Sequence, residues 1–263
     1  MYMKALFLAA LIAVFASIAG CVSQAKQEHT DTTAAPAAVD PAKPNVLVEL
    51  FTSEGCSSCP PADQVLTLLG HQPVVPNVNI ITLGFHVDYW DSRSWRDRFS
   101  SNLFTQRQQA YARGFRIDST YTPQMVVDGS RELVGSNSGG AVDAIGKSAT
   151  QPKGIVAVTL DGGQLHIKVS GLSEHTESTV YLAVAEDKLV SSVNGGENAG
   201  NKLEHSSVVR QLTSVGTVPA KQAAINIDQN LPTDAAWKRE NLKFVVFVQD
   251  NNTLKVLAVA QAS

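Results

Sequence analysis

The feature that most constrains this chain is a pair of cysteines, Cys56 and Cys59, three positions apart between two contrasting apolar patterns. The run from Val46 to Thr52 is almost continuously apolar, as expected of a strand covered on both faces. Residues 62–69 then carry apolar side chains at helical spacing, and Gly70 follows as a C-cap. A cysteine at a helix N-terminus faces the positive end of the helix dipole, which favours the reactive thiolate. The order strand, CxxC, helix therefore predicts a redox-active pair.

The N-terminal segment predicts export from the cytoplasm. Lys4 precedes twelve apolar residues, 5–16, a run shorter than the roughly 20 residues of a membrane helix. We expect a signal peptide over residues 1–20, with an uncleaved anchor helix as the alternative. The tripeptide Ala19-Gly20-Cys21 resembles the lipobox of bacterial lipoproteins, which predicts lipidation of Cys21. Residues 21–44 are rich in Ala, Thr and Pro and are expected to form a disordered tether.

These features predict a lipid-anchored protein on the periplasmic side of the bacterial cell envelope, where disulfides persist. Its expected partners are protein thiols or disulfides of the envelope and, through Cys21, the membrane. The net charge is −3 and the sequence pI is about 6.1, so we expect no nucleic-acid partner.

The first half of the folded part repeats the pattern of strands and helices. Further elements are predicted as a strand over 78–87, a helix capped by Ser100 or Ser101 and ended by Gly114, a hairpin of 124–127 and 132–134, and a helix capped by Ser138 over 141–149. The resulting order is typical of the thioredoxin fold, which we predict over residues 45–152. Pro123, immediately before the hairpin, is then expected to follow a cis peptide bond and to face the cysteines.

The second half changes to short strand patterns separated by turns. Seven strands are predicted, over residues 155–160, 164–169, 179–185, 208–212, 223–227, 242–248 and 254–259. They indicate an antiparallel sandwich over 153–263. The predicted fold class is thus an α/β thioredoxin-like domain followed by an all-β sandwich domain.

Three segments support a resemblance to a known family: Val48 to Asp63, Phe85 to Asp91 and Tyr121 to Val127. They resemble the secreted thioredoxin-like family catalogued as domain of unknown function 1223, and the resemblance runs from residue 45 to the end of the chain. It supports the fold and the redox pair and supplies no substrate. The segment Glu197 to Arg210 is similar to a second motif of the family, although an arginine commonly stands there at the position of Asn201. The loop that carries His205 and Arg210 either covers the thiols or is structural.

The expected function is thiol-disulfide exchange without a cofactor. Cys56, as the outermost thiol, is predicted to attack, Cys59 to resolve the mixed disulfide, and Pro123 to help dock the substrate. His86 either exchanges protons with a cysteine or only hydrogen-bonds Asp88 or backbone.

Two other functions stay open on the same residues. One is a copper-binding module in which Cys56, Cys59 and His86 hold Cu(I). The other is a protein-binding module with an inert disulfide. Residues 85–121, rich in aromatic residues and arginine, are either a docking surface beside the cysteines or a helical subdomain with a basic outer face.

Overall fold

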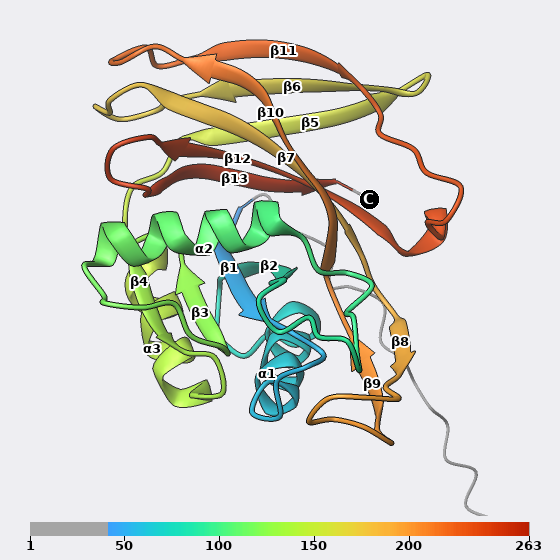
Figure 1. The fold of residues 1–263 in the computed structure, drawn as a ribbon. Coiled ribbons are helices and arrows are strands. Elements are labelled where there is room, and N and C mark those ends of the chain that lie inside the picture. Colours follow the sequence, from blue (N-terminus) through green and yellow to red (C-terminus); the bar gives the residue numbers. More distant parts are fainter. Residues whose placement is uncertain (1–41, 263) are drawn as a thin grey trace, which may run out of the picture. The chain divides into compact units, whose positions relative to one another are not determined.

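The centre of the fold is one eight-stranded mixed sheet to which both halves of the chain contribute (Figure 1). The structure is a computed structural model that describes residues 42–262. The predicted signal peptide and Cys21 lie outside the described residues, as does most of the predicted tether. From edge to edge the strands are β13 (Val256–Ala262), β12 (Leu242–Asp250), β7 (Ser178–Glu186), β10 (Val208–Val218), β2 (Asn79–His86), β1 (Asn45–Thr52), β3 (Gln124–Val127) and β4 (Arg131–Val134).

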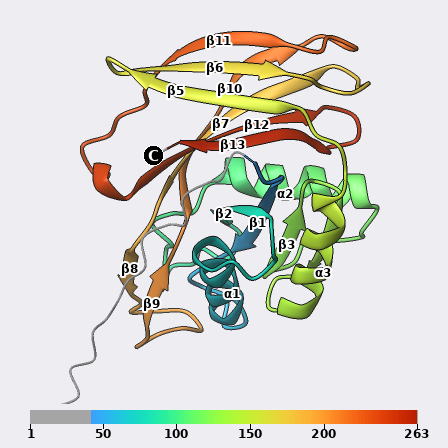
Figure 2. The same ribbon diagram turned by 180° about the vertical axis from the view of Figure 1, so that it is seen from behind.

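Helices cover both faces of the N-terminal half of this sheet. α1 (Pro60–His71) and α3 (Ser138–Ala149) lie on one face, and α2 (Asn102–Phe115) lies on the other (Figures 1 and 2). The central strand β1 is covered on both sides because its residues alternate between two cores. Val46, Val48 and Leu50 pack with α1 and α3, whereas Leu47 and Phe51 pack on the side of α2. This is the double burial that the continuous apolar run predicts.

The two halves of the sheet meet where the first residues of β10 run parallel to β2. Val208 pairs with Gly84, and the Gly84 N–H donates a 2.8 Å hydrogen bond to the carbonyl of Ser207. A Cβ at Gly84 would lie 3.4–3.6 Å from Leu66 and from the carbonyls of Ser206 and Ser207, which is ordinary van der Waals contact. The main chain therefore forms one sheet through the point where a boundary between two domains was expected.

A three-stranded sheet forms a second layer over the strands that the second half of the chain contributes to the large sheet. It consists of β11 (Ile225–Asn230), β6 (Gln164–Ser170) and β5 (Ile155–Asp161). Leu165, Ile167 and Val169 of β6 share a core with apolar residues of β7 and β12. The two layers pack as in a sandwich, but the larger layer continues into the N-terminal half.

The predicted fold class, a thioredoxin-like domain followed by a separate all-β sandwich domain, is therefore wrong. The two sets of strands are hydrogen-bonded into a single mixed sheet. The individual strands were predicted correctly, because each of the seven segments expected to be a strand after residue 152 forms one. The short hairpin of β8 (Leu189–Ser192) and β9 (Lys202–His205) was not predicted, nor was the one-turn 3-10 helix η1 (Arg239–Asn241).

The helix boundaries differ slightly from expectation. Ser101 caps α2 as predicted, and its side chain accepts a hydrogen bond from the Leu103 N–H. α2 passes Gly114 and ends at Phe115, and Arg116 adopts the left-handed conformation. Asn137 caps α3 in place of Ser138. Over the described part of the chain, no helix has the length and apolar character needed to cross a membrane.

Candidate functional site

Cys56 and Cys59 form a disulfide at the start of α1. Their Cα atoms are 5.4 Å apart, Cys59 is the N-cap of the helix, and prolines occupy its first positions. Both cysteines are 0% exposed, although Ser57 and Ser58 between them are exposed. Cys56 was expected to be the outermost thiol, but it is as buried as Cys59. Its sulfur nevertheless lies 3.4 Å from the hydroxyl oxygen of the exposed Ser58.

The cover over this disulfide comes from residues 193–201, which connect β8 to β9 and which we call the cover loop. Its Glu197 carboxylate accepts hydrogen bonds from the N–H and the hydroxyl of Ser57, at 3.0 and 2.7 Å. These two hydrogen bonds lower the pKa of Glu197 below its ordinary value of 4.5. The buried Asn198 amide donates to the carbonyls of Glu54 and Cys56, both at 2.9 Å. The cover loop is thus bonded to the main chain on either side of Cys56.

Packing of glycine residues brings the cover loop close to a second segment, 91–98. A Cβ on Gly195 would lie 2.0 Å from the carbonyl oxygen of Ser94, so only glycine permits this contact. The neighbouring Gly196 has a φ of +72° and lies against Trp95. The cover loop and segment 91–98 are therefore in contact.

Pro123 lies beside the first turn of α1. The Thr122-Pro123 peptide bond is cis, as predicted. A Cβ on Gly135 would lie 3.1 Å from the Cβ atoms of both Pro123 and Ala62, and Ala62 is three residues beyond Cys59. Trp90 supports the same region, because its indole N–H donates a 2.7 Å hydrogen bond to the Thr122 hydroxyl.

His86 ends β2 and is buried next to the segment that leads to Cys56. Its Nδ1 lies 2.6 Å from Oδ2 of Asp97, so its partner is neither Asp88 nor backbone. The same carboxylate oxygen accepts a 2.9 Å hydrogen bond from the Glu54 N–H, two residues before Cys56. His86 therefore contacts the site through Asp97 and the main chain of Glu54.

The His86–Asp97 pair shifts both pKa values. Burial alone would raise the pKa of Asp97, but the charge and hydrogen bond of His86 and two backbone N–H groups outweigh it and lower the pKa to about 2. For His86, burial acts to lower the pKa, and the attraction of Asp97, Asp63 and Glu54 outweighs it, so the pKa is raised. A protonated His86 beside an ionised Asp97 is the charge state that these contacts favour.

His205, the last residue of β9, lies between two buried carboxylates. Its Nε2 is 3.4 Å from Oε1 of Glu54, and its Nδ1 is 3.9 Å from Oδ2 of Asp63. Neither ring nitrogen has a hydrogen-bond partner, and neither does Oε1 of Glu54. The His205 and His86 rings are 5.0 Å apart. Burial raises the pKa of Asp63, although the charges of His205 and His86 act against it.

Sequence reasoning did not single out Glu54, Asp63 or Asp97. Asp63 carries a visible signal, because it shares the buried face of α1 with Leu66 and Leu69 and is a charged residue on an apolar face. Glu54 and Asp97 lie in irregular segments, where periodicity gives no guidance.

The alternative metal set is not assembled here. The sulfurs of Cys56 and Cys59 are bonded to each other, and Nδ1 of His86 is bonded to Asp97. In residues 42–262 no group of three or more His, Cys, Asp and Glu is arranged to hold a metal ion. Copper binding remains a prediction.

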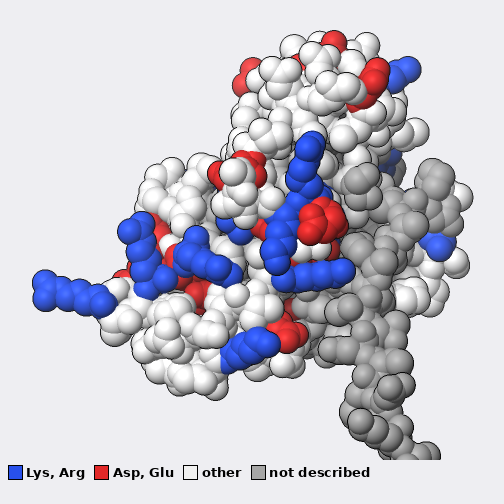
Figure 3. All heavy atoms as spheres, turned by 90° about the vertical axis from the view of Figure 1, so that its right-hand side faces the viewer, with Lys and Arg blue, Asp and Glu red and all other residues white. Residues whose placement is uncertain are grey.

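The arginine-rich segment of residues 85–121 contributes one apolar face to the core, and most of its arginines are exposed. Phe85, Phe104 and Tyr111 belong to the same apolar cluster as Phe51, and Arg107 is buried among them. At its edge, Arg98 and Arg210 lie over the ring of Phe99, at 4.6 and 5.1 Å. Figure 3 shows Lys and Arg side chains gathered on this side of the molecule with Asp and Glu among them.

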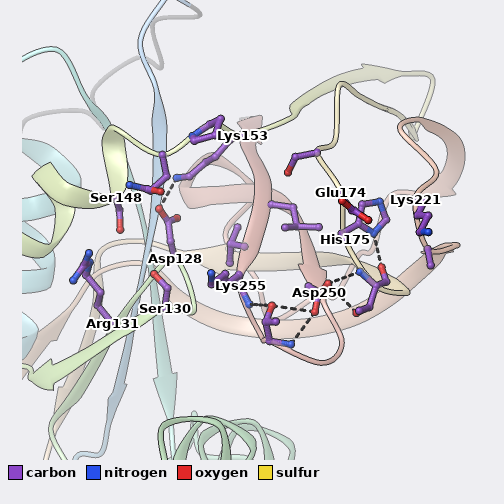
Figure 4. Close-up of a pocket in the computed structure, with 18 residues that line it drawn as sticks. Asp128, Ser130, Arg131, Ser148, Lys153, Glu174, His175, Lys221, Asp250 and Lys255 are labelled. Atoms are coloured by element: carbon purple, nitrogen blue, oxygen red, sulfur yellow. Dashed lines mark hydrogen bonds and ion pairs between the residues drawn. The ribbon is translucent and has the colours of Figure 1, made fainter.

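A cavity of about 820 Å³ lies away from the disulfide and is lined by the β3–β4 and β12–β13 turns and by neighbouring loops (Figure 4). Lys153 pairs there with Asp128. Asp250 accepts hydrogen bonds from Thr176 and Thr253. These buried acids are satisfied within the protein, and neither cysteine lines the cavity.

Fold and site together define a mostly β protein with a large mixed sheet and a covered CxxC disulfide at a helix start. Residues 47–249 match the model of a protein family of unknown function, DUF1223, and the chain belongs to that family. An X-ray crystal structure of a protein from Agrobacterium tumefaciens is similar with a TM-score of 0.68 and 24% identity. The match covers 85% of this chain and 95% of that one, and it concerns the fold.

A domain of the outer membrane lipoprotein Omp28 from Porphyromonas gingivalis matches over 43% of this chain and 88% of its own, with 16% identity. Its TM-score of 0.26 is too low to indicate a shared overall fold. No curated protein matches the chain.

Proposed function

We propose that the protein exchanges its Cys56–Cys59 disulfide with thiols or disulfides of other proteins in the cell envelope. The observation that carries the proposal is the pair itself, bridged at the N-terminus of α1 with Cys59 as the N-cap. The positive end of the helix dipole stabilises a thiolate at that place, which makes Cys59 a good leaving sulfur. A bridge that closes so short a loop constrains the unfolded chain little, so stability alone is a weak reason for it.

Exchange begins with attack of a partner thiolate on Sγ of Cys56. A bond forms between the two proteins, the Cys56–Cys59 bond breaks, and its electron pair leaves with the sulfur of Cys59, which takes a proton. A second partner thiol then attacks the mixed disulfide, releases Cys56 as a thiol and leaves the partner oxidised. The reverse sequence reduces a partner disulfide and forms the Cys56–Cys59 bond again. Cys56 is the sulfur for attack because it lies beside the exposed Ser58.

The cover loop must move before a partner reaches either sulfur, since both cysteines are 0% exposed. The groups released by that movement are the Ser57 N–H and the carbonyls of Glu54 and Cys56. A partner's main chain offers the matching acceptors and donors. Pro123, beside the first turn of α1, is the proposed second contact for the partner chain.

The proposed location is the periplasmic side of the envelope, with a lipid on Cys21. Its support is the apolar run of residues 5–16 followed by Ala19-Gly20-Cys21. Substitution Cys21→Ala is expected to move the protein from the membrane fraction to the soluble periplasmic fraction.

Trapping the mixed disulfide tests the exchange function. Cys59→Ser removes the resolving sulfur, so a partner held on Cys56 is expected to accumulate and to be released by dithiothreitol. Cys56→Ser is the matched control and is expected to trap much less. In the wild-type protein, alkylation of free thiols followed by mass spectrometry is expected to show both oxidised and reduced pairs in cells. A pair that is always oxidised, with no partner trapped on Cys56, would refute the proposal.

The complete burial of the disulfide favours a second candidate, a bridge that only fastens residues 56–59. In that case the folded protein resists dithiothreitol until it unfolds, and reduction lowers the melting temperature. Reduction of the folded protein at an unchanged melting temperature supports exchange instead.

A further inference from the structure

Reduction of the Cys56–Cys59 bond consumes protons, and both sulfurs that take them up belong to buried residues. Two electrons enter the disulfide, and both sulfurs end as thiols only if two protons follow. Cys56 lies beside the surface at Ser58, where water supplies its proton once the cover loop has moved. Cys59 begins the buried side of α1, so its proton must come from buried groups nearby.

Asp63 is the acid next to Cys59. It stands four residues further along α1, and its N–H donates a 3.1 Å hydrogen bond to the Cys59 carbonyl. Side chains four residues apart on a helix share a face, with their Cβ atoms about 5–6 Å apart. Asp63 is buried, and burial raises the pKa of its carboxyl, so it keeps a proton to higher pH than an exposed aspartate.

His205 supplies the second observation. Its side chain is 2% exposed, yet both ring nitrogens lack a hydrogen-bond partner. Buried polar groups without partners are rare in folded proteins and call for an explanation. Glu54 faces one ring nitrogen at 3.4 Å and Asp63 faces the other at 3.9 Å, so a carboxylate stands opposite each N–H of a protonated ring.

We propose that His205, held between Glu54 and Asp63, supplies through Asp63 the proton that the sulfur of Cys59 takes up when the disulfide is reduced. The proposal rests on the exchange function proposed above. The partner thiolate attacks Cys56, the electron pair of the broken bond goes to Cys59, and Asp63 transfers its proton to that sulfur. In the same step His205 gives a proton to Asp63, so the rate of reduction depends on His205, which is reprotonated from solvent when the cover loop is open. On oxidation the same steps run backwards.

His205 acts on the sulfur through Asp63 and is a positioning residue in this scheme. Other charged groups face it from the surrounding elements. His86, on β2, stacks edge-on against its ring and carries Asp97 on the far side. From β10, Arg210 lies beyond the ring of Phe99, which contacts both histidines. The test must therefore separate His205 from His86.

The test is the pH profile of disulfide reduction by dithiothreitol in the folded protein, expressed per dithiothreitol thiolate. For the wild type we expect this rate constant to fall as the pH rises, because the supply of protons to the sulfur of Cys59 falls. For His205→Gln we expect a flat profile and a rate constant about 100-fold lower at the acid end, the low end of the contribution of general acid catalysis. His166→Gln, at an exposed histidine of β6, is expected to keep the wild-type profile. His86→Gln is expected to keep a falling profile.

A measurement on the unaltered protein covers the case in which His205→Gln does not fold. Imidazole NMR signals of His205 are expected to differ between the oxidised and the reduced protein at one fixed pH. Equal signals in the two states, or a wild-type profile retained by a folded His205→Gln, overturn the role of His205. Failure of the folded wild-type protein to react with dithiothreitol at any pH would overturn the exchange function as well, so the two failures are distinguishable.

Discussion

The side-chain amide of Asn198 donates a 2.9 Å hydrogen bond to the carbonyl oxygen of Cys56. The same amide nitrogen also donates to the carbonyl of Glu54, and all three residues are buried. A residue from the connection between β8 and β9 thereby satisfies two main-chain acceptors on the N-terminal side of the disulfide. The cover loop is a hydrogen-bonded part of the disulfide site.

Replacement of this amide is expected to speed access to the disulfide. Asn198→Ala leaves the buried Glu54 carbonyl without a donor when the cover loop is closed, and it leaves the Cys56 carbonyl with the Cys59 N–H alone, at a cost of about 1–3 kcal/mol. An open cover loop lets water reach those carbonyls, so the variant opens more often. We expect the folded variant to be reduced by dithiothreitol about tenfold faster, since about 1.4 kcal/mol corresponds to a factor of ten. Asn194→Ala, at an exposed position of the same loop, is the matched control and is expected to behave like the wild type.

Glu197 makes closure of the cover loop sensitive to acid. Its carboxylate accepts two hydrogen bonds from Ser57, and its pKa is lowered by them. A lowered pKa in the closed state means that closure has its full strength above the ordinary pKa of 4.5 and weakens as the pH falls through the lowered value. We expect reduction by a phosphine, measured relative to a small model disulfide, to accelerate as the pH drops from 6 to 3. Glu197→Gln is expected to be faster at pH 6 and to lose most of this acceleration; an unchanged acid response in that variant would assign it to another group.

The local elements of this fold could be predicted from sequence because their causes are local. Apolar residues from 46 to 52 mark a doubly buried strand, and Asp128-Gly129 marks a hairpin turn. The continuity of the large sheet could not be predicted, since it depends on the meeting of Gly84 with Val208. Nothing in the periodicity of either strand indicates which distant strand will lie beside it.

The sequence predicts the motif residues of the candidate site but not their tertiary contacts. The disulfide, the cis bond before Pro123 and the presence of His86 near the site follow from motif and order. The burial of both cysteines does not, because the cover loop follows the short strand β8, which has few apolar residues. The partners of His86 and His205 also depend on tertiary contacts. Sequence alone therefore gives the two cysteines and misses the groups that cover and surround them.

Arg107 is expected to be essential for stability. Its guanidinium is buried and bonded to the Glu49 carboxylate at 2.7 Å, and the rings of Phe85, Tyr111, Tyr181 and Phe247 surround it. Burial acts to lower the pKa of Arg107, but the charge of Glu49 outweighs it, so the pKa is raised. Arg107→Met leaves the Glu49 carboxylate unpaired in the core, which typically costs about 3–5 kcal/mol of the free energy of unfolding.

Urea unfolding measures this loss. Arg113→Met, at an exposed position of the same helix, is the control and is expected to change the unfolding free energy by less than about 0.5 kcal/mol. The double variant Glu49→Gln, Arg107→Met is expected to be more stable than Arg107→Met alone, because no buried charge is left unpaired. A double variant no more stable than Arg107→Met would show that packing against the four rings, and not the charge pair, carries the effect.

Gly129 joins the hairpin of β3 and β4 to the turn between β12 and β13. A Cβ at this position would lie 1.9 Å from the carbonyl oxygen of Leu254, and the residue has a φ of +61°. Gly162, in the turn between β5 and β6, has a φ of +54° but no atom within 4 Å of its Cβ position. Alanine in the left-handed conformation of either glycine is strained by about 1–2 kcal/mol, and only Gly129→Ala also forces the two turns apart.

We expect the free energy of unfolding in urea to fall by about this strain energy for Gly162→Ala and by more than about 3 kcal/mol for Gly129→Ala. Equal losses would mean that the β12–β13 turn moves away from Gly129 at little cost, and the two halves of the sheet would then be joined mainly through β2 and β10.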